Sequence, residues 1–475
     1  MLRKLLIYPP LAFARLGNSR MPLDGFFWGP NDVTPRGTGK TTILPAETLV
    51  MHDDGTLSSR VPDTIRFKDE TGFRPVCPFF EIHGEWDAGD AGEARGQGPL
   101  DPDVLRRFGL DTSRLRWRVD VANLKPYFMT QDWQTRIDAG VVLRGDDVTP
   151  RTLRGRSPSG APEALVPRGT HVPLGVVRLS RPNEAFPGLR LRFIPGRGRF
   201  FGPSDLRERW KAKLPRRQLF LNPRSSWCSW RPKSDDPRGN PGGQYAKDED
   251  SHVSLGLVDD TCDGIVSCWI EGIAVPPAYA RIVVGPPDYA PDRRPLVSLA
   301  DGLKDRVARD EVFERGYLDA DDHARAEAER EVVDMMERAF ETMALMNLDV
   351  LNDRVDTLEN REAALAQGIP YRDTDHYAFP PAEPMPGDPL PLTERGREQH
   401  RRYLVPEVFA DFVSKRPDFM ARWVRPPLSP DPFFTPRMPA LMRGASGHPL
   451  HLTRRQYDLL RLWLARLRNP RKTPR

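Results

Sequence analysis

Residues 251–291 read SHVSLGLVDDTCDGIVSCWIEGIAVPPAYARIVVGPPDYAP, a stretch that combines a polar turn with two apolar segments. The first segment is Ile265–Ile270, where only Ser267 interrupts the apolar character. This composition predicts a strand that is buried on both faces. The second segment, Arg281–Val284, is followed by Gly285-Pro286-Pro287, and it should end there because proline cannot donate to a sheet ladder. The stretch therefore predicts two strands, and the rest of the chain is interpreted around them.

The polar turn before these strands reads VDDTCDG and contains three acidic residues. Asp259, Asp260 and Asp263 can cap a turn by accepting from their own backbone amides, with Gly264 at positive φ. The same carboxylates could instead hold a hard cation. The ligand spacing and distal glutamate of an EF-hand are absent, so the turn is the favoured interpretation and the metal site the weaker one.

Two other segments alternate apolar and polar residues, which is typical of a half-buried strand with one wet face. One places apolar side chains on a single face at Leu115, Trp117, Val119 and Val121. The other places Leu189, Leu191 and Phe193 on one face and Arg190 and Arg192 on the opposite face. The chain thus looks β-rich up to about residue 300, with long loops between strands, and Leu5–Leu16 is interpreted as its first strand.

Helical spacing appears only later in the chain. Residues 319–347 carry apolar side chains at helical spacing behind an acidic start, which suits the positive end of a helix dipole. Residues 452–467 form a second candidate, because Thr453 and Gln456 stand at the spacing of a capping box. A weaker candidate, 403–423, is interrupted by Pro406.

These patterns predict an α+β protein, with a β-rich N-terminal domain of sandwich-like sheets and long loops followed by a mainly helical C-terminal region. At 475 residues the chain is long enough for two or three hydrophobic cores. Its 50 prolines and 37 glycines, beside 39% hydrophobic residues, indicate many turns and not disorder. The expected divisions are a β-rich domain at 1–300, a helical segment at 301–367, a proline-rich connection at 368–397 and a helical region at 398–475.

Charge and targeting signals exclude several classes of partner. A net charge of +5 is small for this length, so nucleic-acid binding is not predicted. No apolar run approaches the ~20 residues that span a bilayer, so no membrane association is predicted. Four cysteines (Cys77, Cys228, Cys262 and Cys268) show no CxxC pair and no metal-finger spacing, which favours a reduced, cytoplasmic setting.

Other motifs carry little chemistry by themselves. Residues 36–42, RGTGKTT, resemble a phosphate-binding loop, but Thr34 stands where that motif requires its first glycine. His376 and the pair His448 and His451 supply too few donors for a closed metal site. Cys228, inside Trp227-Cys228-Ser229-Trp230, is interpreted as part of a buried anchor and, less readily, as a reactive thiol.

Several segments together resemble the LodA-like family, the quinoprotein amino-acid oxidases typified by lysine ε-oxidase and glycine oxidase. They occur in the family's order and lie at Ile7–Ser19, Leu115–Asn123, Asp259–Gly264, Arg281–Pro291 and Leu452–Leu460. The resemblance implies an oxidase scaffold, a flavoprotein maturation partner, and cysteine tryptophylquinone built from a Cys and a Trp of the C-terminal region. That cofactor accepts an amine as a Schiff base and releases ammonia, and reoxidation by oxygen yields peroxide.

This sequence departs from the family pattern because its last cysteine is Cys268, so residues 269–475 cannot supply the thioether sulfur. No cofactor is therefore predicted, and the segment that carries it in the family is expected to be missing. A cross-link from Cys228 or Cys268 to a tryptophan such as Trp230 or Trp269 is the alternative. Those four residues are the candidate catalytic set, and only that alternative includes cysteine tryptophylquinone.

The leading hypothesis is a soluble relative of these oxidases that has lost the self-derived quinone and binds a partner or a small amino compound. The alternative is an active amino-acid or amine oxidase that uses an atypical cross-link or a segment from another chain. A third hypothesis is an accessory subunit whose proline-rich loops are contact surfaces.

Overall fold

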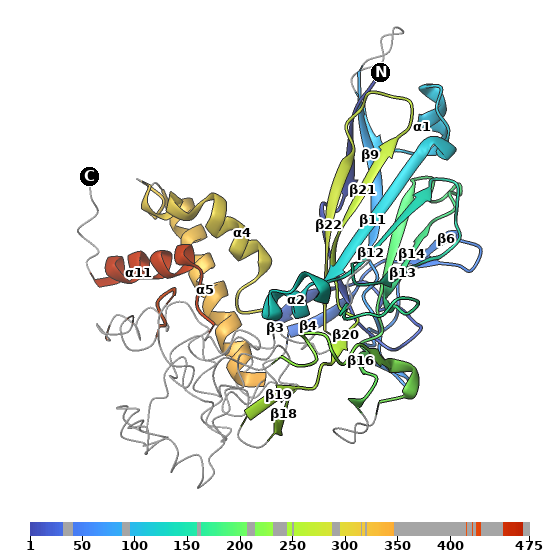
Figure 1. Cartoon of the computed structure of the whole chain (residues 1–475). Coiled ribbons are helices and arrows are strands. Elements are labelled where there is room, and N and C mark those ends of the chain that lie inside the picture. The colour runs from blue at the N-terminus through green and yellow to red at the C-terminus, as the bar shows by residue number, and fades with distance from the viewer. Residues whose placement is uncertain are drawn as a thin grey trace. The chain divides into compact units, whose positions relative to one another are not determined.

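The computed structural model describes residues 1–31, 41–87, 96–158, 163–206, 214–230, 245–248, 251–286, 295–314, 316–318, 321–345, 415, 420, 424–428 and 450–468. The chain divides into two compact units. One unit contains residues 1–27 and 44–289, and the other contains residues 28–43 and 290–475. Figure 1 shows strands concentrated in the first unit and the long helices in the second.

Two large sheets form the first unit. The first sheet has the order β1 (Leu2–Tyr8), β9 (Phe79–Trp86), β15 (Arg190–Pro195), β14 (Val172–Leu179) and β13 (Arg151–Gly155), with β10 (Gly96–Pro99) also paired to β9. The second sheet has the order β12 (Ile137–Arg144), β11 (Leu115–Asn123), β21 (Asp263–Ile270), β22 (Ala278–Gly285) and β2 (Leu11–Arg15). Neighbouring strands are antiparallel except for β2 and β22, which are parallel.

Shorter elements connect and flank these sheets. The strands are β3 (Phe26–Asn31), β4 (Thr41–Pro45), β5 (Thr48–Met51), β6 (Leu57–Arg60), β7 (Lys68–Asp69), β8 (Gly72–Phe73), β16 (Phe200–Pro203), β17 (Leu219–Leu221), β18 (Tyr245–Asp248), β19 (Ser251–Ser254) and β20 (Val258–Asp259). The helices are α1 (Pro102–Arg107) and α2 (Lys125–Thr130), with 3-10 turns η1 (Thr112–Arg114), η2 (Trp133–Thr135) and η3 (Arg216–Gln218).

One hydrophobic core lies between the two sheets. The inner faces of both sheets belong to a single buried cluster, in which Trp117, Phe80 and Phe193 are fully buried. Burying such faces against each other is how two-layer domains are stabilised. The sandwich-like, β-rich N-terminal region predicted from the sequence is thus confirmed.

The alternation at Leu115–Val121 is confirmed as strand β11, with one buried and one wet face. The prediction for β21 was wrong in part. Its inner residues, such as Val266, are buried, but Ile265 and Trp269 are only half-buried because they point to the outer face of the second sheet. A run of apolar residues does not distinguish a strand covered on both sides from one whose outer face is open.

The single strand predicted at Leu5–Leu16 was also wrong, because the chain breaks there into β1 and β2. Pro9 and Pro10 separate the two strands, and neither proline has an N–H for a sheet ladder. The break sends β1 to the first sheet and β2 to the second. One short apolar stretch therefore contributes an edge strand to each layer.

Helices α4 (Leu299–Val307), α5 (Asp322–Leu345) and α11 (Arg454–Arg468), with the 3-10 turn η5 (Arg309–Phe313), form the helical unit. Helices α5 and α11 confirm the two stronger helix predictions. The capping box is present, because the Thr453 N–H donates to Gln456 Oε1 over 3.0 Å and the Gln456 N–H donates to Thr453 Oγ1 over 3.2 Å. Val332, Leu460 and Trp463 lie in the buried core of this unit.

A buried ion network also joins these helices. Arg455 is 3% exposed, and its Nη1 donates to Glu331 Oε2 over 2.6 Å. Lys304 and Tyr317 contact the same carboxylate. Burial raises the pKa of Glu331, but the hydrogen bonds from Arg455 and Lys304 lower it by more, so the net shift of the pKa is downward. We interpret this network as structural because each charge already has a partner.

Several predictions fall outside the described residues. They concern the connection at 368–397, His376, His448 and most of the segments 36–42 and 403–423. The domain boundaries stay predictions. Within the part of the chain that the structure describes, no helix is long and apolar enough to span a bilayer.

Candidate functional site

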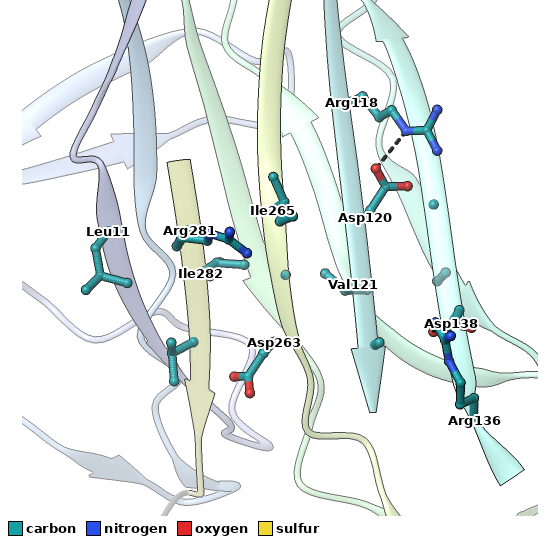
Figure 2. Close-up of a pocket in the computed structure, with 15 residues that line it drawn as sticks. Leu11, Arg118, Asp120, Val121, Arg136, Asp138, Asp263, Ile265, Arg281 and Ile282 are labelled. Carbon is teal, nitrogen blue, oxygen red and sulfur yellow. Dashed lines mark hydrogen bonds and ion pairs between the residues drawn. The ribbon is translucent and has the colours of Figure 1, made fainter. Parts of the chain in front are cut away.

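A groove crosses the outer face of the second sheet, over β12, β11, β21 and β22, and reaches β2 (Figure 2). It has a volume of about 820 Å³ and is open to solvent along the sheet. The groove is lined by Leu11, Arg118, Asp120, Val121, Ala122, Arg136, Asp138, Ala139, Gly140, Asp263, Gly264, Ile265, Arg281, Ile282 and Val283.

Strand register places the central lining residues in one row. Reading across the sheet, successive partners are Gly140, Asp120, Ile265, Arg281 and Leu11. Residues that are directly opposite share a face of the sheet. The next row, two residues along each strand, holds Asp138, Ala122, Asp263 and Val283. The register therefore brings acids and arginines from four distant segments onto one surface.

Two of the three arginines in the groove already have carboxylate partners. Arg118 Nε donates to Asp120 Oδ2 over 2.7 Å. Arg136 Nη2 donates to Asp138 Oδ1 over 3.0 Å, and its guanidinium stacks on the Trp133 ring at 4.1 Å. These contacts fix two neutral pairs at one side of the groove, as Figure 2 shows for Arg118 and Asp120.

The two other charged side chains that line the groove, Asp263 and Arg281, belong to neither of these ion pairs. Asp263 accepts a long bond of 3.4 Å from the Val284 N–H, and Arg281 has no side-chain hydrogen bond or ion pair among the described residues. Arg281 pairs with Ile265, so Asp263 is its diagonal neighbour, at a separation of about 7–8 Å between such Cα positions. Figure 2 shows Arg281 near the level of Ile265 and Asp263 lower in the view, on the same face of the sheet. They place one acidic and one basic group on the same face of the second sheet.

Burial raises the pKa of the Asp263 carboxyl, although the Val284 N–H and the charge of Lys125 act in the opposite direction. A carboxylate whose charged form is poorly solvated gains more from a cationic ligand than a free surface acid does. The groove thus favours an ammonium group beside Asp263.

Glycines at two positions permit this arrangement. A Cβ at Gly140 would lie 2.6 Å from Asp120 Oδ1, so the missing side chain leaves room for that carboxylate. Gly264 was expected at positive φ, but it lies inside β21 instead. A Cβ there would lie 2.4 Å from the Asp120 carbonyl oxygen, so Gly264 allows β11 and β21 to approach closely.

The three acids of the polar turn point to different partners. Asp260 is 1% exposed and accepts from the backbone N–H groups of Arg197 (2.8 Å) and Arg199 (3.1 Å). Asp259 accepts from Asn123 and Lys125. Asp260 therefore holds another loop and does not cap its own turn. Among the described residues no group of three or more His, Cys, Asp or Glu side chains is placed to hold a metal ion.

The candidate catalytic residues lie apart from the groove. Cys228 is 2% exposed, and the neighbouring Trp227 stacks on Trp230 with ring centroids 6.3 Å apart, as expected for a buried anchor. Cys268 and Trp269 are successive residues of β21, so their side chains point to opposite faces of the second sheet. Their juxtaposition in sequence does not bring the sulfur to that indole.

Cys268 instead lies directly opposite Trp117 across the β11–β21 ladder, and both residues are 0% exposed. Burial raises the pKa of the Cys268 thiol well above its ordinary value. Burial also raises the pKa of the Cys77 thiol to about 12, and it raises that of the Cys262 thiol. Cysteine tryptophylquinone does not fit here, because an amine could not reach a carbonyl on Trp117 inside the closed core.

Sequence reasoning missed the groove. Arg118 and Asp120 were recognised only as the wet face of a strand, and Arg281 only as the start of an apolar run. The sequence signal that could have indicated the groove is that Arg118, Asp120 and Arg281 each occupy an outward-facing position of a strand. His451, the one candidate histidine within the described residues, contacts the Leu452 carbonyl oxygen at 2.8 Å through its Nδ1.

Comparison with known proteins finds likeness only among solved structures. No family model and no curated protein matches the chain. It is similar to the L-Lys ε-oxidase of Marinomonas mediterranea, with 15% identity, a TM-score of 0.42, and coverage of 97% of this chain and 60% of that chain. Two further structures of that enzyme, one of them the Schiff base intermediate with L-Lys, have 16% identity, TM-scores of 0.36 and 0.35, and coverage of 79% and 49%. The chain spans about half to three fifths of the length of these oxidases.

Proposed function

We propose that the chain has a scaffold of the quinoprotein amino-acid oxidase type and builds no quinone from its own side chains. It binds a small amino compound in the groove over the second sheet. The ordered family-like segments support the scaffold. The closed surroundings of Cys228 and Cys268 support the absence of a self-derived quinone. The observation that carries the binding proposal is the pair of opposite charges left at Asp263 and Arg281.

Charge balance in the groove favours a zwitterion. Three arginines and three aspartates line it, and two pairs are satisfied internally. A ligand carboxylate would pair with the Arg281 guanidinium, whose planar fork suits a bidentate contact. A ligand ammonium would pair with Asp263, while Leu11 and Ile265 offer apolar surface to a side chain. An amino acid carries both charges within a few bonds, which matches diagonal neighbours on a sheet.

These residues can bind and orient an amine, but they cannot oxidise it. Oxidation of an amine through a Schiff base needs an electrophilic carbonyl, which no ordinary side chain supplies. The proposal therefore separates binding, which this chain performs, from redox chemistry, which would require a group from elsewhere.

Calorimetric titration of the chain with a panel of amino acids tests the binding site. We expect one-site binding that weakens at least about 10-fold in Arg281→Gln and in Asp263→Asn, because each change removes one charge-assisted contact of about 1.5–3 kcal/mol. Arg144→Gln is the matched control, since Arg144 is exposed on the same sheet and paired with Asp146. Equal affinities in the wild type and all three variants would place the ligand outside the groove. Binding that is weakened only by Arg144→Gln would do the same.

Intact mass spectrometry with quinone staining tests the absence of a self-derived cofactor. We expect the mass of the unmodified sequence and no staining band, because the sulfurs of Cys262 and Cys268 are buried in the core. A mass shift together with a stained band on the chain would contradict the proposal.

The alternative, an active amino-acid oxidase with an atypical cross-link, would require the closed core around Cys268 and Trp117 to open to an amine. Cys268 lies opposite Trp117, and directly opposed residues have Cβ atoms about 4.5–5.5 Å apart. Peroxide release from an amino-acid panel, measured with and without a co-expressed flavoprotein, separates the two. Release that disappears in Cys268→Ala would support the alternative.

A further inference from the structure

Arg192 of β15 is a buried arginine without a partner among the described residues. Its exposed fraction is 8%, and no described residue forms a hydrogen bond or ion pair with its side chain. Its Nε is fully enclosed and has no acceptor. The strand pattern predicted a wet face for Arg190 and Arg192, and for Arg192 that prediction was wrong because its side chain is covered. A buried charge without a counter-charge is strongly unfavourable, and arginine cannot lose its proton to escape that cost.

Among the residues that the structure describes, the charges on neighbouring strands do not compensate Arg192. Arg178 lies directly opposite it across the β14–β15 ladder, and like charges in that position destabilise a sheet. The Arg178 side chain donates to the backbone carbonyls of Val148, His52 and Asp53, so it brings no carboxylate to this surface.

Glu81 is an acid on the same face of the first sheet, and its two oxygens are already committed. Its Oε1 contacts His83 Nε2 at 2.8 Å, and its Oε2 pairs with Arg190. The local charge around Arg178 and Arg192 is thus positive, which a bound anion would offset.

Aromatic packing orients the Arg192 guanidinium. Its Cζ lies 4.8 Å from the centre of the Phe79 ring, the residue paired with Arg192 on β9. Stacking of this kind leaves the edge of the guanidinium plane free for a planar or tetrahedral oxyanion. Cys77 is a neighbour of Arg192, and its thiol stays neutral because burial raises its pKa to about 12. Arg192 keeps 8% of its surface exposed, so solvent reaches part of the side chain.

We propose that Arg192 is the centre of an oxyanion site on the outer face of the first sheet, which takes a carboxylate or phosphate group. The guanidinium binds two oxygens of the anion, and Phe79 holds it in the binding orientation. This inference is independent of the groove, which lies on the second sheet.

Thermal unfolding of the full chain tests the site, with phosphate or acetate replacing chloride at constant ionic strength. We expect a saturable rise in Tm of about 3–6 °C at ten times Kd in the wild type. In Arg192→Met the rise in Tm should vanish. In chloride this variant should unfold at the same temperature as the wild type or at a higher one, because an apolar side chain has replaced an unpaired buried charge. A response to phosphate but not acetate assigns the site to phosphate, and the reverse assigns it to carboxylates.

Arg151→Met is the matched control, because Arg151 lies on the same sheet, is half-exposed and pairs with Asp147. It should keep the full response to anions. An equal anion response in wild type and Arg192→Met would overturn the proposal, as would a loss of Tm by Arg192→Met in chloride. Should that variant fail to fold, calorimetric titration of the wild type with phosphate and with acetate decides, and no one-site binding of either anion overturns the proposal.

Discussion

Replacing Trp117 with alanine is expected to lower the free energy of unfolding of the β-rich unit by about 3–5 kcal/mol. Trp117 is fully buried in the middle of β11, where it lies opposite Leu143 on β12 and Cys268 on β21. Removing the indole withdraws apolar area from the core and leaves a cavity that three strands, fixed by their ladders, cannot collapse to fill. The loss would be a large part of the stability of an ordinary domain.

Urea unfolding followed by far-ultraviolet circular dichroism measures this loss. Tyr279→Ala is the matched control, because Tyr279 is an aromatic residue on the outer face of the same sheet and is 64% exposed. We expect that control to cost less than about 1 kcal/mol. Similar losses for both variants would show that the inner face of the second sheet is not the closed core described above.

Local pattern predicted strand β11 together with its one wet face. In β11 the alternation of Leu115, Trp117 and Val119 with arginines needs no knowledge of partners, because a period of two already assigns the faces. The same reasoning succeeded for α11, where the cap and the apolar stripe lie within 15 residues. It failed at β21 and at Arg192, because coverage of an outer face depends on segments distant in the sequence.

The groove could not be predicted for a related reason. Asp120, Asp263 and Arg281 become neighbours only through the register of β11, β21 and β22, which a single sequence does not specify. The composition of each strand gave no reason to pair these residues. Likewise, the turn chemistry at Asp260 suggested a local cap, whereas its partners are the amides of Arg197 and Arg199, more than 60 residues earlier.

Asp260 gives the β-rich unit a specific pH dependence. Burial raises the pKa of its carboxyl from 3.8 to about 6, although the N–H groups of Arg197 and Arg199 oppose that shift. A Cβ at Gly196 would lie 2.5 Å from Asp260 Cγ, so the loop packs directly on the carboxyl group. Because the folded pKa lies above the unfolded pKa, the stabilising contribution is fully present below about pH 4 and is lost as the pH rises through about 6. A shift of this size corresponds to about 3 kcal/mol.

Asp260→Asn should remove this dependence, because asparagine resembles the protonated carboxyl in shape and stays neutral. We expect the free energy of unfolding of the wild type, measured in urea between pH 4 and pH 7, to contain a falling component of about 3 kcal/mol that Asp260→Asn lacks. Asp103→Asn is the control, since Asp103 is 72% exposed on α1 and should leave the profile unchanged. A profile for Asp260→Asn parallel to that of the wild type would contradict this prediction, because it would show that the Asp260 carboxyl takes up protons equally in the folded and unfolded chain over this pH range. A wild-type component that rises with pH and is absent from Asp260→Asn would contradict it in the other direction, because the loop 196–199 would then depend on the charge of Asp260 and the unit would lose stability toward acid.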